Sequence, residues 1–122
     1  MIEPRVKATT FEVNGTTYKL PTSPIAVICL DGSADAYLDA ALARDAMPHL
    51  KKISVEGFRG QARSALPSFT NVNNASIVTG CPPEVHGICG NFFLNPDTGE
   101  EVMMNSASFL RCATIFSAAA NS

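Results

Sequence analysis

Apolar residues gather along the chain in two runs that predict buried strands. Residues 25–30, IAVICL, form a continuous β-prone run, which is typical of a strand covered on both faces of a parallel sheet. Residues 58–66, FRGQARSAL, predict a second strand with a weaker apolar signal. We therefore expect two strands of one sheet, with residues 31–57 between them in the sequence.

Helical patterns lie between and after these runs. Residues 35–45 place their apolar side chains on one side, and residues 48–57 begin with a proline and end at a glycine, as helices often do. Residues 69–79 predict a helix that ends at Gly80, and the apolar run 111–122 predicts a last one. The chain should therefore contain four helices.

Two segments predict antiparallel hairpins. Residues 11–20 carry an Asn-Gly pair between short β-prone stretches, and residues 91–104, NFFLNPDTGEEVMM, carry a Pro-Asp-Thr-Gly turn. The order of elements indicates an α/β class with a mainly parallel sheet flanked by helices. Two good parallel strands are few for such a sheet, so we interpret the chain as a domain cut short.

Composition and charge narrow the class of protein. The 122 residues are 46% hydrophobic and 16% charged, which is globular rather than disordered. The net charge of −2, without blocks of like charge, argues against a nucleic-acid surface. The longest apolar run is too short to span a membrane, and the amino terminus lacks the regions of an export signal. We expect a cytoplasmic protein whose four cysteines are reduced thiols.

The first candidate for chemistry is Thr70, in the stretch LPSFTNVNNASIVTG. If Ser68 is the N-cap, Thr70 is the second helical residue, in the turn whose N–H groups and dipole favour an anion. A hydroxyl there can attack phosphorus when a divalent metal makes it more acidic. Position alone favours the alternative that Thr70 contributes to capping. Asn73 and Asn74 share its face and are interpreted as polar supports of the helix head.

Asp31 and Asn91 are the next candidates. Asp31 directly follows the run 25–30, at the carboxyl edge of a sheet where open α/β folds bind ligands, although it could equally cap the next helix. Asn91 offers an amide N–H that can stabilise a developing negative oxygen. Position alone leaves the role of each residue open.

The histidines and cysteines offer a second kind of site. Cys81, His86 and Cys89 have the spacing C-x4-H-x2-C of a zinc knuckle, but a fourth ligand is missing nearby. A structural hydrogen-bonding role for His86 is the simpler interpretation, and His49 reads as an exposed or packed side chain. The zinc knuckle remains an alternative for a small non-catalytic domain.

Three stretches together, VICLDGS, LPSFTNVNNASIVTG and PPEVHGICGNFFLNPDTGEEVMM, resemble the alkaline-phosphatase superfamily. The chain is most similar to the nucleotide pyrophosphatase/phosphodiesterase-like branch, and within it to the phosphonoacetate hydrolases. The resemblance covers nearly the whole chain from about residue 13. It implies zinc-dependent cleavage of a small phosphonate, phosphonoacetate, to acetate and phosphate, as in phosphonate catabolism.

The resemblance also implies roles for three residues. Asp31 matches a zinc ligand, Thr70 matches the nucleophile that also contacts zinc and becomes transiently phosphorylated, and Asn91 matches the residue that binds a non-bridging phosphoryl oxygen. His86 matches a histidine that we take as structural. Two zinc ions are implied, and their remaining ligands are not found in this sequence, so we expect a chain of little or no activity by itself.

These implications give the expected organisation and the alternatives. Residues 1–23 are predicted to form the amino-terminal hairpin and linker, and residues 24–122 the first part of an alkaline-phosphatase-like catalytic domain. A phosphodiesterase or nucleotide pyrophosphatase of the same superfamily is the alternative enzyme. The expected partner is a small-molecule phosphonate, with neither nucleic acid nor membrane, and a homodimer is left open.

Overall fold

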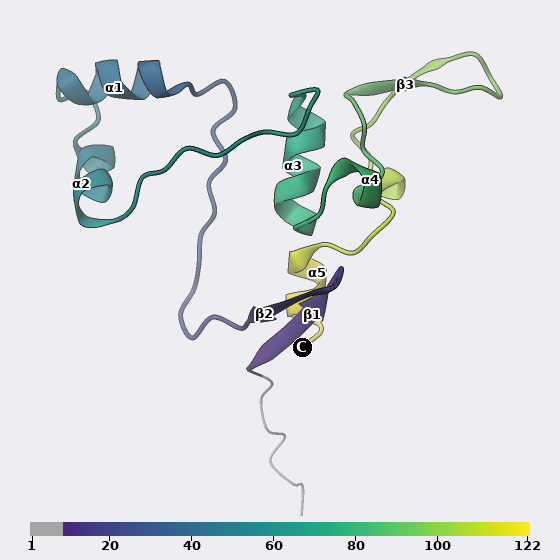
Figure 1. The fold of residues 1–122 in the computed structure, drawn as a ribbon, viewed down its shortest axis with the longest axis horizontal. Helices are drawn as coiled ribbons and strands as arrows, with labels where there is room; N and C mark the ends of the chain where they lie inside the picture. Colours follow the sequence, from purple (N-terminus) through teal and green to yellow (C-terminus); the bar gives the residue numbers. More distant parts are fainter. Residues whose placement is uncertain (1–8) are drawn as a thin grey trace, which may run out of the picture. The chain divides into compact units, whose positions relative to one another are not determined.

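The computed structural model describes residues 9–122, which form two units (Figure 1). One unit contains residues 9–25 and 64–122, and the other contains residues 26–63. The predicted division of the chain into residues 1–23 and 24–122 stays a prediction.

The larger unit begins with an antiparallel pair of strands, β1 (Thr10–Val13) and β2 (Thr16–Lys19). The turn between them is Asn14-Gly15, and both residues have positive φ, of 51° and 77°. This is the primed type of turn, whose twist matches that of the strands. The Asn14 side chain donates from Nδ2 to the carbonyls of Thr79 and Ala113, at 2.8 Å each, and so ties the turn to two later segments.

The remainder of this unit is built around helix α3 (Thr70–Thr79). It is followed by the short α4 (Pro83–His86), by strands β3 (Phe92–Leu94) and β4 (Glu101–Met103), by a 3-10 turn η1 (Ala107–Phe109) and by α5 (Ile115–Ala120). Strands β3 and β4 pair antiparallel. Helix α3 contacts α4 and α5, and α5 also contacts β1.

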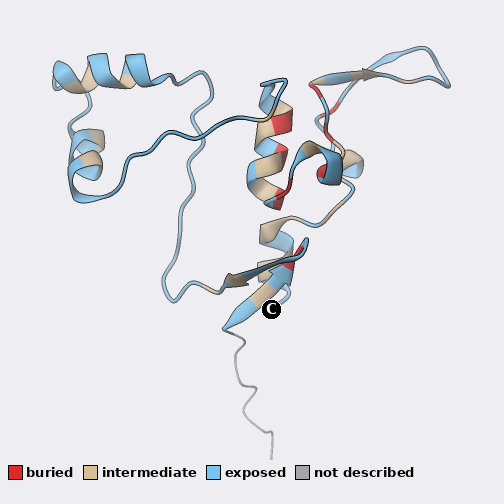
Figure 2. Cartoon of the chain, in the orientation of Figure 1, coloured by how far each residue is buried: buried red, intermediate tan, exposed pale blue. Residues whose placement is uncertain are grey.

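The core of this unit is small. Val72, Ala75, Ile88 and Met104 are buried together, so residues from α3, from the loop after α4 and from the segment directly after β4 share one cluster. Figure 2 shows the buried residues concentrated on α3, on α4 and on the loop that follows. The core therefore fixes the loop after α4 against α3, which is the arrangement on which the site depends.

The smaller unit consists of α1 (Asp35–Ala43) and α2 (Pro48–Glu56), which pack on each other. Arg59 donates to the carboxylates of Asp35 at 2.9 Å and Asp39 at 2.7 Å and so attaches the following segment to α1. This arginine lowers the pKa of Asp35 below its ordinary value. All three side chains are at least 39% exposed to solvent, so the pairs contribute little to stability.

The predicted parallel sheet is not confirmed, because the strands among the described residues 9–122 form two antiparallel pairs. Residues 25–30 and 58–66 contain no strand. A strand exists only where a neighbour about 4.8 Å away accepts and donates its hydrogen bonds. The apolar pattern indicates that a segment is compatible with a sheet, but it does not show which other strand would pair with it.

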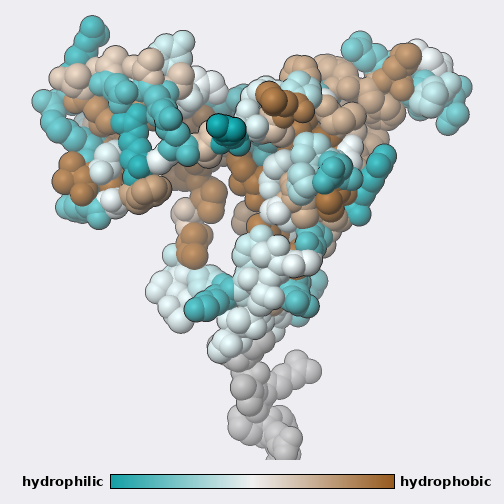
Figure 3. All heavy atoms as spheres, viewed as in Figure 1, coloured by the Kyte–Doolittle hydropathy of each residue, from teal (hydrophilic) through white to brown (hydrophobic). Residues whose placement is uncertain are grey.

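Figure 3 shows hydrophobic residues on the molecular surface. Segment 25–30 adds to the exposed apolar surface, because Ile25, Val27, Ile28 and Leu30 are all more than half exposed. No helix among residues 9–122 has both the length and the apolar character needed to cross a bilayer.

Candidate functional site

The start of α3 is defined by backbone hydrogen bonds. The N–H of Asn73 donates to the carbonyl of Phe69 at 3.1 Å, and Phe69 has the extended conformation of an N-cap, so Thr70 is the first helical residue. The expectation that Ser68 is the N-cap is therefore wrong. The reason is that Phe69 closes a turn first, through its N–H to the Pro67 carbonyl at 3.0 Å. Thr70 thus lies one position nearer the helix end than predicted.

A residue distant in the sequence does the work of a cap. The Phe69 side chain provides no capping bond, but the N–H of Asn71 donates to Oδ1 of Asn91 at 3.1 Å. Asn71 is the second helical residue, whose N–H has no acceptor within the helix. Asn91 therefore lies at the first turn of the helix that Thr70 begins, and the structure brings these two predicted site residues to one place.

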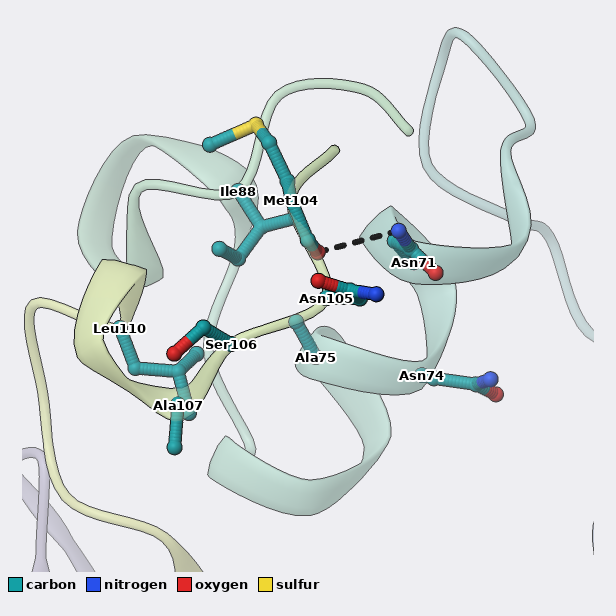
Figure 4. Close-up of a pocket in the computed structure, with 9 residues that line it drawn as sticks. All are labelled: Asn71, Asn74, Ala75, Ile88, Met104, Asn105, Ser106, Ala107 and Leu110. Atoms are coloured by element: carbon teal, nitrogen blue, oxygen red, sulfur yellow. Dashed lines mark hydrogen bonds between the residues drawn. The ribbon is translucent and has the colours of Figure 1, made fainter. Parts of the chain in front are cut away.

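Met104 closes a small network with these two asparagines. Its N–H donates to the carbonyl of Asn91 at 2.7 Å, and its carbonyl accepts from Nδ2 of Asn71 at 3.0 Å (Figure 4). The helix, the loop after α4 and the residue directly after β4 are thus joined at one point. Asn71 and Met104 were not among the predicted residues. Only the position of Asn71 directly after Thr70 could have indicated its role.

The network leaves a defined set of donors. Because Oδ1 of Asn91 accepts from the helix, its Nδ2 protons are the part of that side chain that can donate to a ligand. The helix dipole adds positive partial charge at the same end. An anion with several oxygens, such as a phosphoryl group, is the ligand that such donors favour.

Asn73 and Asn74 differ in what they support. Asn73 accepts from the Ala65 N–H at 2.9 Å and donates to the Phe69 carbonyl at 3.0 Å, so it holds the segment that enters the helix, as a polar support should. Asn74 lines an open cavity of about 210 Å³ on the same side of α3 as Asn71 and Ala75. In Figure 4 its side chain points away from the bond between Asn71 and Met104.

His86 is completely buried at the end of α4. Its Nδ1 accepts from the Ile88 N–H at 3.1 Å, and its Nε2 lies 3.0 Å from Oγ of Ser76. Burial lowers the pKa of the imidazole below its ordinary value, so the ring is neutral at pH 7. This is the structural hydrogen-bonding role that the sequence favoured.

The zinc-knuckle alternative does not agree with this geometry. Both ring nitrogens of His86 are engaged with protein atoms, Cys81 is buried and directs its thiol to the Thr79 carbonyl, and Cys89 is exposed. Zinc binding to His86 would have to break one of its two hydrogen bonds. None of the four cysteines, all of which lie among residues 9–122, forms a disulfide.

Asp31 lies in the smaller unit, where its Oδ1 accepts from the Gly32 N–H at 3.0 Å. Thr70 and Asn91 lie in the larger unit. The convergence of Asp31 with these two residues therefore stays a prediction.

The expected zinc pair needs more donors than the described residues bring. Asp31 and Thr70 offer two oxygen ligands, whereas a catalytic zinc ion takes about three protein ligands. Among residues 9–122 no group of three or more His, Cys, Asp or Glu side chains could hold a metal ion. The described residues do not fit a zinc site by themselves.

Comparison with known proteins identifies the family. The model of the type I phosphodiesterase / nucleotide pyrophosphatase family matches residues 25–121. The chain belongs to this family. Thr70 and Asn91, joined through the first turn of α3, and Asp31 all lie within the matched residues.

Two relatives within the family are eukaryotic. The chain is 30% identical over 83 residues to an ectonucleotide pyrophosphatase/phosphodiesterase of Caenorhabditis elegans, covering 67% of this chain and 11% of that protein. It is 34% identical over 100 residues to an uncharacterized pyrophosphatase/phosphodiesterase of Schizosaccharomyces pombe, covering 78% of this chain and 20% of that protein.

The solved structures that it resembles are phosphonoacetate hydrolases from Sinorhizobium meliloti 1021. One was determined in complex with phosphonoacetate and the other with phosphonoformate, at 52% and 53% identity and a TM-score of 0.78 each. Each comparison covers 92% of this chain and 27% of the solved chain. The chain therefore has the fold of the corresponding part of an alkaline-phosphatase-like hydrolase, and it spans about a quarter of that protein's length.

Proposed function

We propose that this chain carries the nucleophile and the phosphoryl-binding amide of an enzyme that hydrolyses the carbon–phosphorus bond of phosphonoacetate. The observation that carries the proposal is the hydrogen bond from the Asn71 N–H to Asn91, because it brings a side-chain amide to the helix end that Thr70 begins. The resemblance to a hydrolase solved with phosphonoacetate supports this substrate.

In the proposed reaction the Thr70 oxygen attacks phosphorus and forms a phosphothreonine. The carbon–phosphorus bond breaks, its electron pair passes to the acetate carbon, and the adjacent carboxylate delocalises the charge as an enolate. The proton released by the Thr70 hydroxyl, passed on through solvent, completes acetate. Water then attacks phosphorus, the bond to the Thr70 oxygen breaks, one proton of the water passes to that oxygen, and phosphate leaves with the water oxygen. Nδ2 of Asn91 donates to a non-bridging oxygen, where negative charge grows in the transition state.

Zinc belongs to the proposal for a complete protein. Asp31 and Thr70 would supply two of its ligands there, and further ligands would come from elsewhere. We also propose a cytoplasmic location, which the four cysteines without a disulfide support.

Substitution of Thr70 provides the decisive test. The assay uses the entire protein that is encoded by the reading frame of this chain. Phosphate release from phosphonoacetate should fall to the detection limit in Thr70→Ala, while Thr70→Ser, which keeps a hydroxyl, should retain measurable activity. Acid quenching during turnover should leave phosphate on Thr70 of the unsubstituted enzyme. An alanine variant that keeps more than about a tenth of the rate would contradict the nucleophile role.

A second candidate function is phosphodiester or nucleotide pyrophosphate hydrolysis with the same residues. The family and the Caenorhabditis elegans relative favour it. A phosphodiester such as bis(p-nitrophenyl) phosphate distinguishes the two functions. Faster turnover of the diester than of phosphonoacetate would replace the first candidate by the second.

A further inference from the structure

His86 connects two parts of the candidate site. On one side, its Nε2 lies 3.0 Å from Oγ of Ser76, which itself donates to the Val72 carbonyl at 3.1 Å. On the other side, its Nδ1 accepts from the Ile88 N–H at 3.1 Å. Because Nδ1 accepts, the ring proton lies on Nε2 and is donated to Ser76. The ring therefore links helix α3 to the loop that follows α4.

This loop ends at Asn91. It is hydrogen-bonded to α3 at two positions along the helix: at Ser76 through His86, and at Asn71 through Asn91. Between them, Ile88 packs into the core with Val72. Two attachments along one helix fix both the position and the orientation of a loop. With a single attachment, the loop could still rotate about that contact.

Both ring nitrogens of His86 depend on their hydrogen bonds within the protein. His86 is 0% exposed, so water cannot replace a lost partner of either ring nitrogen. No buried side-chain nitrogen or oxygen among the described residues lacks a partner. Loss of one ring bond should therefore move the loop rather than leave an unpaired group in place.

We propose that His86 is the positioning residue of the phosphoryl-binding amide: it holds the loop of residues 87–91 on α3 and thereby directs Asn91 to the first turn. It acts through Asn91 and does not contact substrate. This inference rests on the role of Asn91 in the proposed function.

The first test needs no activity and uses the 122-residue chain. His86→Asn keeps an oxygen near Nδ1, so it retains the Ile88 bond and loses the bond to Ser76. Ser76→Ala removes the same bond from the helix side. In both variants, hydrogen exchange of the Asn71 amide should accelerate about fivefold or more, because the Asn91 acceptor is no longer held in place.

The matched control is His49→Asn, which makes the same change at an exposed histidine in α2. Exchange at Asn71 should not change in this variant. If His86→Asn does not fold, Ser76→Ala still tests the link, since alanine favours helix formation. Unchanged exchange at Asn71 in folded Ser76→Ala would overturn the proposal.

The second test asks whether His86 acts through Asn91 in the whole reading-frame product. His86→Asn should lower kcat for phosphonoacetate about tenfold and leave KM within about twofold, because the amide acts mainly on the transition state. In an Asn91→Ala background the same substitution should change kcat less than about twofold. A histidine that only stabilises the fold would lower kcat equally in both backgrounds, and that result would contradict the inference.

The hydrogen-exchange test and the activity test separate this inference from the proposed function. If the unsubstituted enzyme does not act on phosphonoacetate, the proposed function is wrong, and the exchange of the Asn71 amide still decides whether His86 positions Asn91.

Discussion

Asn91 shows how one side chain serves both the fold and the site. Its Oδ1 accepts from the first turn of α3, which frees the other half of the amide to donate. Its backbone carbonyl accepts from Met104, so the residue is held by both its side chain and its main chain. Fold and function therefore use different atoms of the same residue, and substitutions can separate them.

We predict that Asn91→Asp and Asn91→Ala separate these two roles. Alanine removes the acceptor at the helix start and should lower the free energy of unfolding by about 1 kcal/mol. Aspartate keeps an acceptor and places negative charge at the positive helix end, so the free energy of unfolding should stay equal or rise. Both variants lose the donor, and phosphate release should fall about 100-fold or more in each. Urea titrations and phosphate release measure the two quantities, and a fully active aspartate variant would contradict the donor role.

His86 predicts a dependence of stability on pH. Burial lowers its pKa in the folded state below the ordinary value of 6.5, so the unfolded chain binds the proton more readily. The contribution of His86 to the free energy of unfolding should be complete above pH 6.5 and should decrease as the pH falls below that value. The difference in free energy of unfolding between the unsubstituted chain and His86→Asn, measured by urea titration at several pH values, should shrink on acidification. A difference independent of pH would contradict the prediction.

At the scale of elements, three helices could be predicted closely, whereas α4 was missed and the predicted parallel strands are not confirmed. Helices were expected over 35–45, 48–57 and 69–79, and α1, α2 and α3 begin and end within two residues of these bounds. Helical hydrogen bonds join residues four apart, so a local pattern contains most of the information. Strands depend on partners elsewhere in the chain, which the pattern of residues 25–30 does not identify.

The tight end of α4 gives a prediction at this scale. Gly87 has φ of 81°, and a Cβ there would lie 2.6 Å from Cδ of Arg111. Gly99 has a similar φ of 71° in open space, so Gly99→Ala should lose only the conformational term, about 1 kcal/mol of unfolding free energy. Gly87→Ala should lose roughly 1 kcal/mol more, because the arginine must move. Removal of that side chain in Gly87→Ala/Arg111→Ala should recover part of the loss in urea titrations, and equal losses in the two alanine variants would contradict the clash.

At the scale of the whole molecule, the candidate site could be predicted only in part. Thr70 and Asn91 are 21 positions apart, and no periodicity relates them; the family motifs alone indicated that they converge. The structure joins them through the backbone and side chain of Asn71 and the backbone of Met104. Of these two residues, only Asn71 has a sequence signal, its position directly after Thr70. Asp31 has the clearest sequence signal of the three, directly after an apolar run, yet its place in the site stays a prediction.

The exposed apolar segment 25–30 gives the last prediction. Ile28 is 80% exposed, so Ile28→Lys removes little packing and should change the free energy of unfolding by less than about 0.5 kcal/mol. An exposed run of apolar side chains favours association, so the same substitution should raise the concentration at which light scattering begins. Tyr37→Lys, on α1, is the matched control because it adds the same charge at an exposed aromatic residue outside the run. An equal effect of both lysines would assign the change to net charge, whereas a larger effect at Ile28 assigns it to the apolar segment.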